Sequence, residues 1–221
     1  PVATLLHPAR TAARARRIDP ARAQCRVEPT QLAGLSDMKG HDTIYLTTID
    51  AEGNIMSLIQ SNYSGFGSGF VAVGTGFMLQ NRGALFTLEP GQPNTLEPRK
   101  RPLHTIIPGF MAKGDERIGF GIMGGWNQAQ AHAQFVSNVV DHGLSLQQAL
   151  EAGRFTKPTF EGCDVFVEDR VPAASRDALA PLGHEVTVPR PRSGEFGFGQ
   201  AVRDDGRGGD RKRWLIIPTA G

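Results

Sequence analysis

The stretch from His41 to Gly69 constrains the fold of this chain more than any other. Two runs of strand-forming residues, 43–50 and 54–61, flank the turn-forming sequence DAEGN, and a glycine-rich loop, SGFGSG, follows the second run. The pattern predicts a β-hairpin that ends in a loop where the backbone approaches its neighbours closely. We therefore expect the rest of the chain to be organised around this hairpin.

Short strands and helices follow the hairpin, separated by turns. The run at 5–24 is arginine-rich and compatible with a short solvated helix, residues 33–41 are typical of an exposed linker, and the proline-dense residues 90–102 predict a surface loop. Hydrophobic periodicity predicts strands at 103–110, 117–123, 165–167, 184–188 and 196–202, and helices at 126–143, 146–154 and 173–180. Antiparallel strands with helices grouped after them are typical of the α+β class.

Composition narrows the function classes. The 221 residues carry 39% hydrophobic and 21% charged residues, as expected for one globular domain. The net charge is only +2 and the arginines gather at the two ends, so we expect no nucleic-acid partner. No apolar run is long enough to span a membrane. The chain begins without methionine, so we expect a fragment and leave its compartment open between cytoplasm and periplasm.

Cysteines and histidines give little sign of a metal or redox site. Cys25 and Cys163 lie far apart with no metal-binding or redox spacing, and we expect two unpaired thiols in a reducing compartment. No His/Cys/Asp cluster supports a metal ion, and no cofactor is expected. His132 lies in a predicted helix without a carboxylate spaced for a relay, which favours a packed or solvated side chain over a catalytic one.

A threonine at the start of the hairpin suggests chemistry. Threonine is a poor nucleophile without a base, and one possible base is its own α-amine, freed by cutting the preceding peptide bond. Thr43 follows His41–Asp42, where such a cut is possible. Downstream, Gly124–Gly125 opens a predicted helix, whose N-terminal amides stabilise anions. Together these features suggest a nucleophile with an oxyanion hole.

Several motifs, in this order, resemble the γ-glutamyltransferase family of N-terminal nucleophile hydrolases. They are DT at the strand start, DAEGN, SGFGSG, GFMLQNRGALF, KRPLHTIIP, GGWNQAQAHAQ, LEAGRF and LGHEV. Residues 1–42 resemble the end of the family's large subunit, and residues 43–221 its small, catalytic subunit. The resemblance implies an αββα four-layer sandwich, incomplete because most of the large subunit is absent.

The resemblance also implies site residues. Thr43 would be the nucleophile, first in autocatalytic cleavage after Asp42 and then in forming an acyl-enzyme, with its freed amine as base. Ser61 would hydrogen-bond to Thr43, and the amides of Gly124 and Gly125 would stabilise the oxyanion. The residues that would line the substrate pocket are Tyr63, Arg82, His104 and Thr105. A heterodimer with the missing large-subunit portion would follow cleavage, acting on a small γ-glutamyl or acyl-amide substrate.

Two departures leave three functions open. Leu85 stands where family members that hold a glutamate α-amino group have an acidic residue, and His104–Thr105 replaces a serine pair. The leading hypothesis is a γ-glutamyltransferase or glutathione hydrolase-like enzyme. The second is a cephalosporin or glutaryl acylase-type amidohydrolase on the same fold, because Leu85 cannot pair with an ammonium group. The third is a non-catalytic, truncated remnant that acts as an interaction module.

Overall fold

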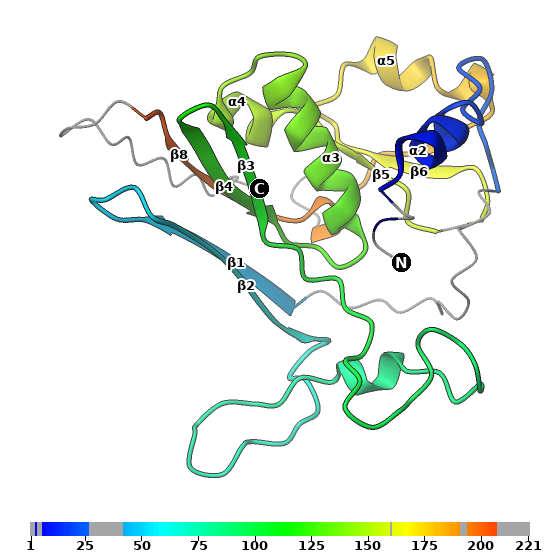
Figure 1. Cartoon of the computed structure of the whole chain (residues 1–221). Helices are drawn as coiled ribbons and strands as arrows, with labels where there is room; N and C mark the ends of the chain where they lie inside the picture. The colour runs from blue at the N-terminus through cyan, green and yellow to red at the C-terminus, as the bar shows by residue number, and fades with distance from the viewer. Residues whose placement is uncertain (1–2, 4–5, 27–41, 160, 191–193, 207–221) are drawn as a thin grey trace.

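The computed structural model describes residues 3, 6–26, 42–159, 161–190 and 194–206 (Figure 1). Its helices are α2 (Pro8–Ala15), α3 (Asn127–Val140), α4 (Leu146–Glu151) and α5 (Ala173–Asp177), with 3-10 turns η1 (Arg82–Leu85), η2 (Ala180–Leu182) and η3 (Gly194–Phe196). Its strands are β1 (Asp42–Ile49), β2 (Ile55–Tyr63), β3 (Gly109–Lys113), β4 (Glu116–Ile122), β5 (Phe155–Thr156), β6 (Asp164–Val167), β7 (Glu185–Thr187) and β8 (Gly199–Asp204). The linker predicted at 33–41 lies outside the described residues.

Strands β1 and β2 form the predicted hairpin. They pair antiparallel, with Ile49 opposite Ile55 next to the turn. One carboxylate oxygen of Asp50 accepts hydrogen bonds from the backbone N–H groups of Glu52 (3.0 Å) and Asn54 (2.8 Å), and Gly53 adopts a φ of 85°. The turn sequence DAEGN therefore closes the hairpin as its residue types predict.

The hairpin packs on one face of the sheet β3–β4–β8, and α3 and α4 cover the other face (Figure 1). The two faces of β4 differ in side-chain size. Ile118, Phe120 and Ile122 point into the core shared with the helices. Gly119 and Gly121 face the hairpin: a Cβ added at Gly119 would lie 2.8 Å from Thr47 Oγ1, and one at Gly121 would overlap the Tyr45 ring. These glycines let the two sheets approach closely.

The outer face of the hairpin is mostly apolar and exposed. Beside the exposed Thr48 and Gln60, it carries Ile44, Leu46, Met56 and Leu58, which are between 44% and 67% exposed. In the described residues, α3 with α4, the sheet β3–β4–β8 and the hairpin thus form three successive layers. A fourth layer, as the αββα sandwich requires, would cover this face, and it stays a prediction.

Two predicted strands begin later than expected. The strand predicted from residue 103 begins at Gly109, because the N–H of Leu103 donates to the Asn94 side chain (3.2 Å) and that of Ile107 to Gln128 (3.3 Å) instead of to a neighbouring strand. The strand predicted from residue 196 begins at Gly199, since η3 comes first. In the first place side-chain contacts replace strand pairing, and in the second a local 3-10 turn replaces the start of the strand.

The prediction of unpaired cysteines is wrong. Cys25 and Cys163, 138 residues apart, form a disulfide with a Cα–Cα distance of 4.3 Å. The third sheet, β5–β6–β7, brings Cys163 to the start of β6, and the segment after α2 lies against it. Sequence spacing carries no information about a pair this distant. Separately, no helix in the described ranges is long and apolar enough to cross a membrane.

Candidate active site

Thr43 and Ser61 meet at the open end of the hairpin. The strands pair Thr43 directly with Ser61, and Thr43 Oγ1 donates a hydrogen bond to Ser61 Oγ over 3.0 Å. Thr43 is 8% exposed, so its hydroxyl is sheltered from bulk water. The hairpin register therefore fixes where the threonine hydroxyl lies.

Ser61 Oγ is the centre of a hydrogen-bonded cluster. Besides the bond from Thr43, it accepts hydrogen bonds from the backbone N–H of Tyr63 (2.9 Å) and from Arg82 Nη2 (2.9 Å). Arg82 Nη1 reaches on to Thr105 Oγ1 over 3.2 Å. A hydroxyl oxygen held by a backbone amide and a guanidinium has little freedom to turn, so Ser61 orients the Thr43 hydroxyl.

Arg82 is a buried cation. It is 4% exposed, and its guanidinium carbon lies 4.7 Å from the centre of the Tyr63 ring. Burial lowers the pKa of Arg82, while the electrostatic effect of Tyr63 opposes that shift; burial likewise raises the pKa of Tyr63 against the effect of Arg82. In the part of the chain that the structure describes, no Asp or Glu forms an ion pair with Arg82. A buried cation held only by hydroxyls and a ring favours an incoming anion.

The backbone is irregular beside the Asp42–Thr43 bond. Asp42 pairs with Tyr63 while Thr43 pairs with Ser61, so the register shifts between these two positions. Tyr63 adopts a φ of 77°, in the left-handed region that a bulky residue avoids, at a cost of about 1–3 kcal/mol. The strain lies directly opposite the bond that the sequence predicts to be cut.

Asn81 is a residue that the sequence analysis missed. Its side-chain nitrogen donates to the carbonyls of Ser64 (3.1 Å) and Gly67 (3.0 Å), and its oxygen accepts from the N–H of Ser64 (3.2 Å). Asn81 thus fastens the glycine-rich loop to the start of η1 and places Arg82 against the hairpin. The motif GFMLQNRGALF contains Asn81, but this role depends on partners 14 and 17 residues away.

Gly124 and Gly125 form the turn between β4 and α3. They adopt φ values of 133° and 58°, which favour glycine, and their carbonyls accept hydrogen bonds from Asn127 N (3.0 Å) and Gln128 N (3.2 Å). Because the C=O and N–H of a trans peptide point in opposite directions, the N–H of Gly125 points away from the helix. The pair therefore presents an amide at the positive end of a 14-residue helix.

Packing between the sheets relates this turn to Thr43. Thr47 on β1 faces Gly119 on β4, and Tyr45 on β1 faces Gly121 on β4. The two strands therefore run in opposite directions across this contact. Thr43 lies two residues before Tyr45 on β1, and the glycine pair follows the end of β4, three residues after Gly121. The threonine and the predicted oxyanion amides thus belong to the same end of the two sheets.

Arg154, which the sequence analysis did not single out, binds the 196–197 backbone that packs against Met123 and Gly124. Its Nη1 donates to the carbonyls of Phe196 (2.8 Å) and Gly197 (3.1 Å), and its Nη2 to Glu168 Oε1 (3.2 Å). Gly197 packs so tightly that an added Cβ would overlap the Met123 carbonyl. Burial lowers the pKa of Arg154, and the Glu168 carboxylate opposes that shift. The motif LEAGRF contained Arg154, but its burial depends on residues more than 40 positions away.

Two of the described histidines, His104 and His132, lie apart from this cluster. His104 is exposed, and no hydrogen bond joins it to Arg82 or Ser61 among the described residues. His132 is buried as expected: its Nε2 accepts a hydrogen bond from Ile122 N (2.8 Å), and burial lowers its pKa to about 4. His41 lies outside the described residues. Within those ranges, no group of three His, Cys, Asp or Glu side chains could hold a metal ion.

Comparison with known proteins gives one consistent family. Residues 1–214 match the sequence profile of the gamma-glutamyltranspeptidase family. The glutathione hydrolase-like YwrD proenzyme of Bacillus subtilis is 38% identical over 175 residues, which are 76% of this chain and 33% of that protein. This chain therefore spans about a third of the length of that relative.

Two solved structures extend the comparison. The cephalosporin acylase from Bacillus halodurans has a TM-score of 0.74 at 41% identity, over 89% of this chain and 34% of that one. An acivicin-inhibited gamma-glutamyltranspeptidase has a TM-score of 0.60 at 25% identity, over 72% of this chain and 88% of that one. The first match leaves two thirds of the acylase chain without a counterpart here.

Proposed function

The chain belongs to the gamma-glutamyltranspeptidase family, and we propose that it is a self-cleaving enzyme in which Thr43 carries an acyl group from an amide donor to water or an amine. The observation that carries this proposal is the hydrogen-bonded cluster in which Ser61 joins Thr43 to the buried Arg82. In this proposal residues 1–42 are the end of a large subunit and residues 43–221 are the small, catalytic subunit. The two remain together as a heterodimer after cleavage.

The first step in the proposal is cleavage of the chain. Thr43 Oγ1 attacks the carbonyl carbon of Asp42, the peptide C–N bond breaks as the acyl group moves from nitrogen to oxygen, and water hydrolyses the resulting ester. The products are a carboxylate at Asp42 and a free amine at Thr43. The strained Tyr63 opposite this bond supports the step, because strain that is released on cleavage favours the products. The B. subtilis relative is likewise named a proenzyme.

The second step is acyl transfer. The freed Thr43 amine accepts the hydroxyl proton as Oγ1 attacks the donor amide, and the same proton passes to the leaving amine. The amides of Gly124 and Gly125 stabilise the oxyanion, each donor contributing about 3 kcal/mol. Water or an amine acceptor then attacks the ester and frees Thr43. Ser61 takes no part in bond making; it holds the hydroxyl in its attacking direction.

Arg82 suggests the class of acyl group. A γ-glutamyl group carries a carboxylate, and a buried guanidinium with hydroxyl partners is a suitable binding group for it. Tyr63 and Thr105 hold the guanidinium from two sides. We therefore propose donors with a carboxylate at the far end of the acyl chain, γ-glutamyl amides first among them. His104, which is exposed, is proposed to line the substrate pocket.

A second candidate function is favoured by Leu85. Leu85 is 6% exposed and lies three residues after Arg82 in the same 3-10 turn. In such a turn, side chains three residues apart lie on the same side. An apolar neighbour gives no partner to the α-ammonium of a γ-glutamyl group. A glutaryl amide, which has the carboxylate but lacks the ammonium, would lose nothing. The cephalosporin acylase with 41% identity supports this alternative.

A paired assay separates these functions. The protein, co-expressed with a complete large-subunit portion, is given γ-glutamyl-p-nitroanilide and glutaryl-p-nitroanilide, and a Thr43→Ala variant is the control. Release of nitroaniline from both donors, lost in the variant, is the expected result. Turnover retained without Thr43 would contradict the nucleophile. No turnover and no acyl-enzyme with a threonine-reactive glutamine analogue would instead favour a non-catalytic interaction module.

A further inference from the structure

The disulfide joins the two parts of the chain that the proposed cut would separate. Cys25 lies upstream of the Asp42–Thr43 bond, and Cys163 lies downstream of it. Cutting that bond opens the loop that the disulfide closes but leaves the disulfide itself intact. We propose that Cys25–Cys163 keeps the upstream polypeptide covalently attached after cleavage, so that the mature protein is one disulfide-linked, two-chain molecule. This inference rests on the proposed self-cleavage.

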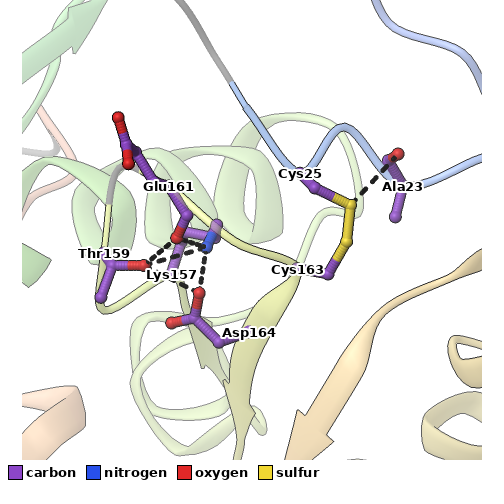
Figure 2. Close-up of a disulfide and its surroundings, with 7 residues drawn as sticks. All are labelled: Ala23, Cys25, Lys157, Thr159, Glu161, Cys163 and Asp164. Carbon is purple, nitrogen blue, oxygen red and sulfur yellow. Dashed lines mark hydrogen bonds and ion pairs between the residues drawn. A yellow bond between two sulfur atoms is a disulfide. The ribbon is translucent and has the colours of Figure 1, made fainter.

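The downstream anchor of the tether is well held. Cys163 directly precedes β6, and its carbonyl accepts a hydrogen bond from Glu185 N on β7 over 2.8 Å. The next residue, Asp164, accepts hydrogen bonds from Lys157 Nζ (2.5 Å) and Thr159 Oγ1 (2.8 Å), as Figure 2 shows. Burial alone would raise the pKa of Asp164, but these bonds and the lysine charge leave it below its usual value. Cys163 therefore stands on a rigid part of the sheet.

The upstream anchor, in contrast, buries little surface within the described residues 6–26. No residue of α2 is buried. After the helix, the N–H of Ala23 donates to the Leu182 carbonyl (2.6 Å), and Arg26 forms an isolated bridge with Glu161. Burial of apolar surface is what keeps separate chains together, and the described residues 6–26 bury little. The covalent bond, rather than packing, is thus what would keep this segment in place once the chain is cut.

The tether has a consequence for association. Two pieces joined by a disulfide recombine as one molecule, at an effective concentration that dilution does not change. To form the bond, the two thiols give two electrons and two protons to a disulfide-bearing oxidant, which becomes a dithiol. The bond therefore requires an oxidising environment during folding, and reductant would release the upstream piece from the cut protein.

The test compares chains separated in denaturant, after free thiols are blocked with N-ethylmaleimide, with and without reductant. The chain, with a complete large-subunit portion as in the paired assay, is used in three forms: unchanged, Cys25→Ser, and Thr43→Ala with a site-specific protease sequence inserted between residues 33 and 41. The third form is cut by the protease after denaturation, so it reports the disulfide whether or not the protein cuts itself. Intact mass and N-terminal sequencing identify every species.

The unchanged protein is expected to have a new N-terminus at Thr43, to run as one species with the mass of the uncut chain plus one water, and to separate into two only with reductant. Cys25→Ser should separate without reductant, and the protease-cut form should stay linked until reduced. Separation of the protease-cut form without reductant, with both cysteines alkylated, would overturn the tether. A linked protease-cut form together with no new N-terminus at Thr43 would instead overturn the self-cleavage, and with it the role after cleavage.

Discussion

The two buried arginines of this fold, Arg82 beside the hairpin and Arg154 at the corner of β5, differ in their partners. Arg154 pairs with Glu168 and donates to two backbone carbonyls. Arg82 is equally buried, yet its side-chain partners are the hydroxyls of Ser61 and Thr105 and the ring of Tyr63. We interpret Arg154, whose charge is neutralised by Glu168, as a structural residue. We interpret Arg82, which has no carboxylate partner among the described residues, as a binding group for an anionic ligand.

Replacing each arginine by methionine tests that contrast on stability. Arg154→Met should lower the free energy of unfolding by about 3–5 kcal/mol, because it leaves Glu168 short of a partner and two buried carbonyls without donors. Arg82→Met should change it by less than about 1 kcal/mol, because methionine replaces a desolvated cation with an apolar chain. Urea denaturation of the two variants measures both values. Equal losses would remove the distinction between the two sites.

How far the sequence could foresee this contrast depends on how local each feature is. The hairpin, its turn, and the helix after Gly124–Gly125 follow patterns that span a few residues, and all were predicted. The resemblance of the motifs also assigned Thr43, Ser61 and Arg82 to one predicted site. The role of Arg154 could not be foreseen, because it depends on carbonyls 42 and 43 residues away.

The errors have the same origin. The strand expected from residue 103 is replaced by side-chain contacts with Asn94 and Gln128, which lie 9 and 21 residues away. The disulfide closes over 138 residues, so no spacing announced it. The φ of 77° at Tyr63 likewise could not be predicted from its residue type, since tyrosine favours extended strands. Strained and long-range features are where sequence patterns stop being informative.

His132 extends the comparison to a buried base that stays uncharged. Its pKa is about 4 in the fold and 6.5 in an exposed chain, so the unfolded state gains the proton first as the pH falls. The contribution of His132 to the free energy of unfolding is therefore complete above about pH 6.5, and the free energy of unfolding falls by about 3 kcal/mol between pH 6.5 and pH 4. His132→Gln, which keeps an acceptor for Ile122 N, should remove this part of the pH dependence. Identical pH profiles for the two proteins would show that His132 does not stay neutral.

The effect of Arg82→Met on activity tests its proposed role in binding the donor. Arg82→Met should lower kcat/KM for a glutaryl amide by about 100-fold, or nearly 3 kcal/mol, because the donor carboxylate loses its cation. The same variant should lose much less on an acyl donor that lacks the carboxylate. The steady-state rates of both donors measure the ratio. A uniform loss on the two donors would place Arg82 in the positioning of Ser61 rather than in substrate binding.

Leu85→Asp adds a carboxylate to the turn that carries Arg82 and so tests which donor the site prefers. We expect the preference for γ-glutamyl over glutaryl donors to rise by about tenfold, because the new carboxylate pairs with the α-ammonium. Leu85→Asn, which has the same shape without the charge, is the matched control. Competition between the two donors measures the preference, and the same shift in both variants would assign the effect to shape.

The central claim is that Thr43 cuts the chain and then carries the acyl group. It is tested most directly by the intact mass and N-terminal sequence of the purified protein after prolonged incubation with a complete large-subunit portion, beside a Thr43→Ala control. We expect a new N-terminus at Thr43 that is absent from the control. A chain that stays uncut under these conditions, or that is cut equally in the control, would contradict the claim.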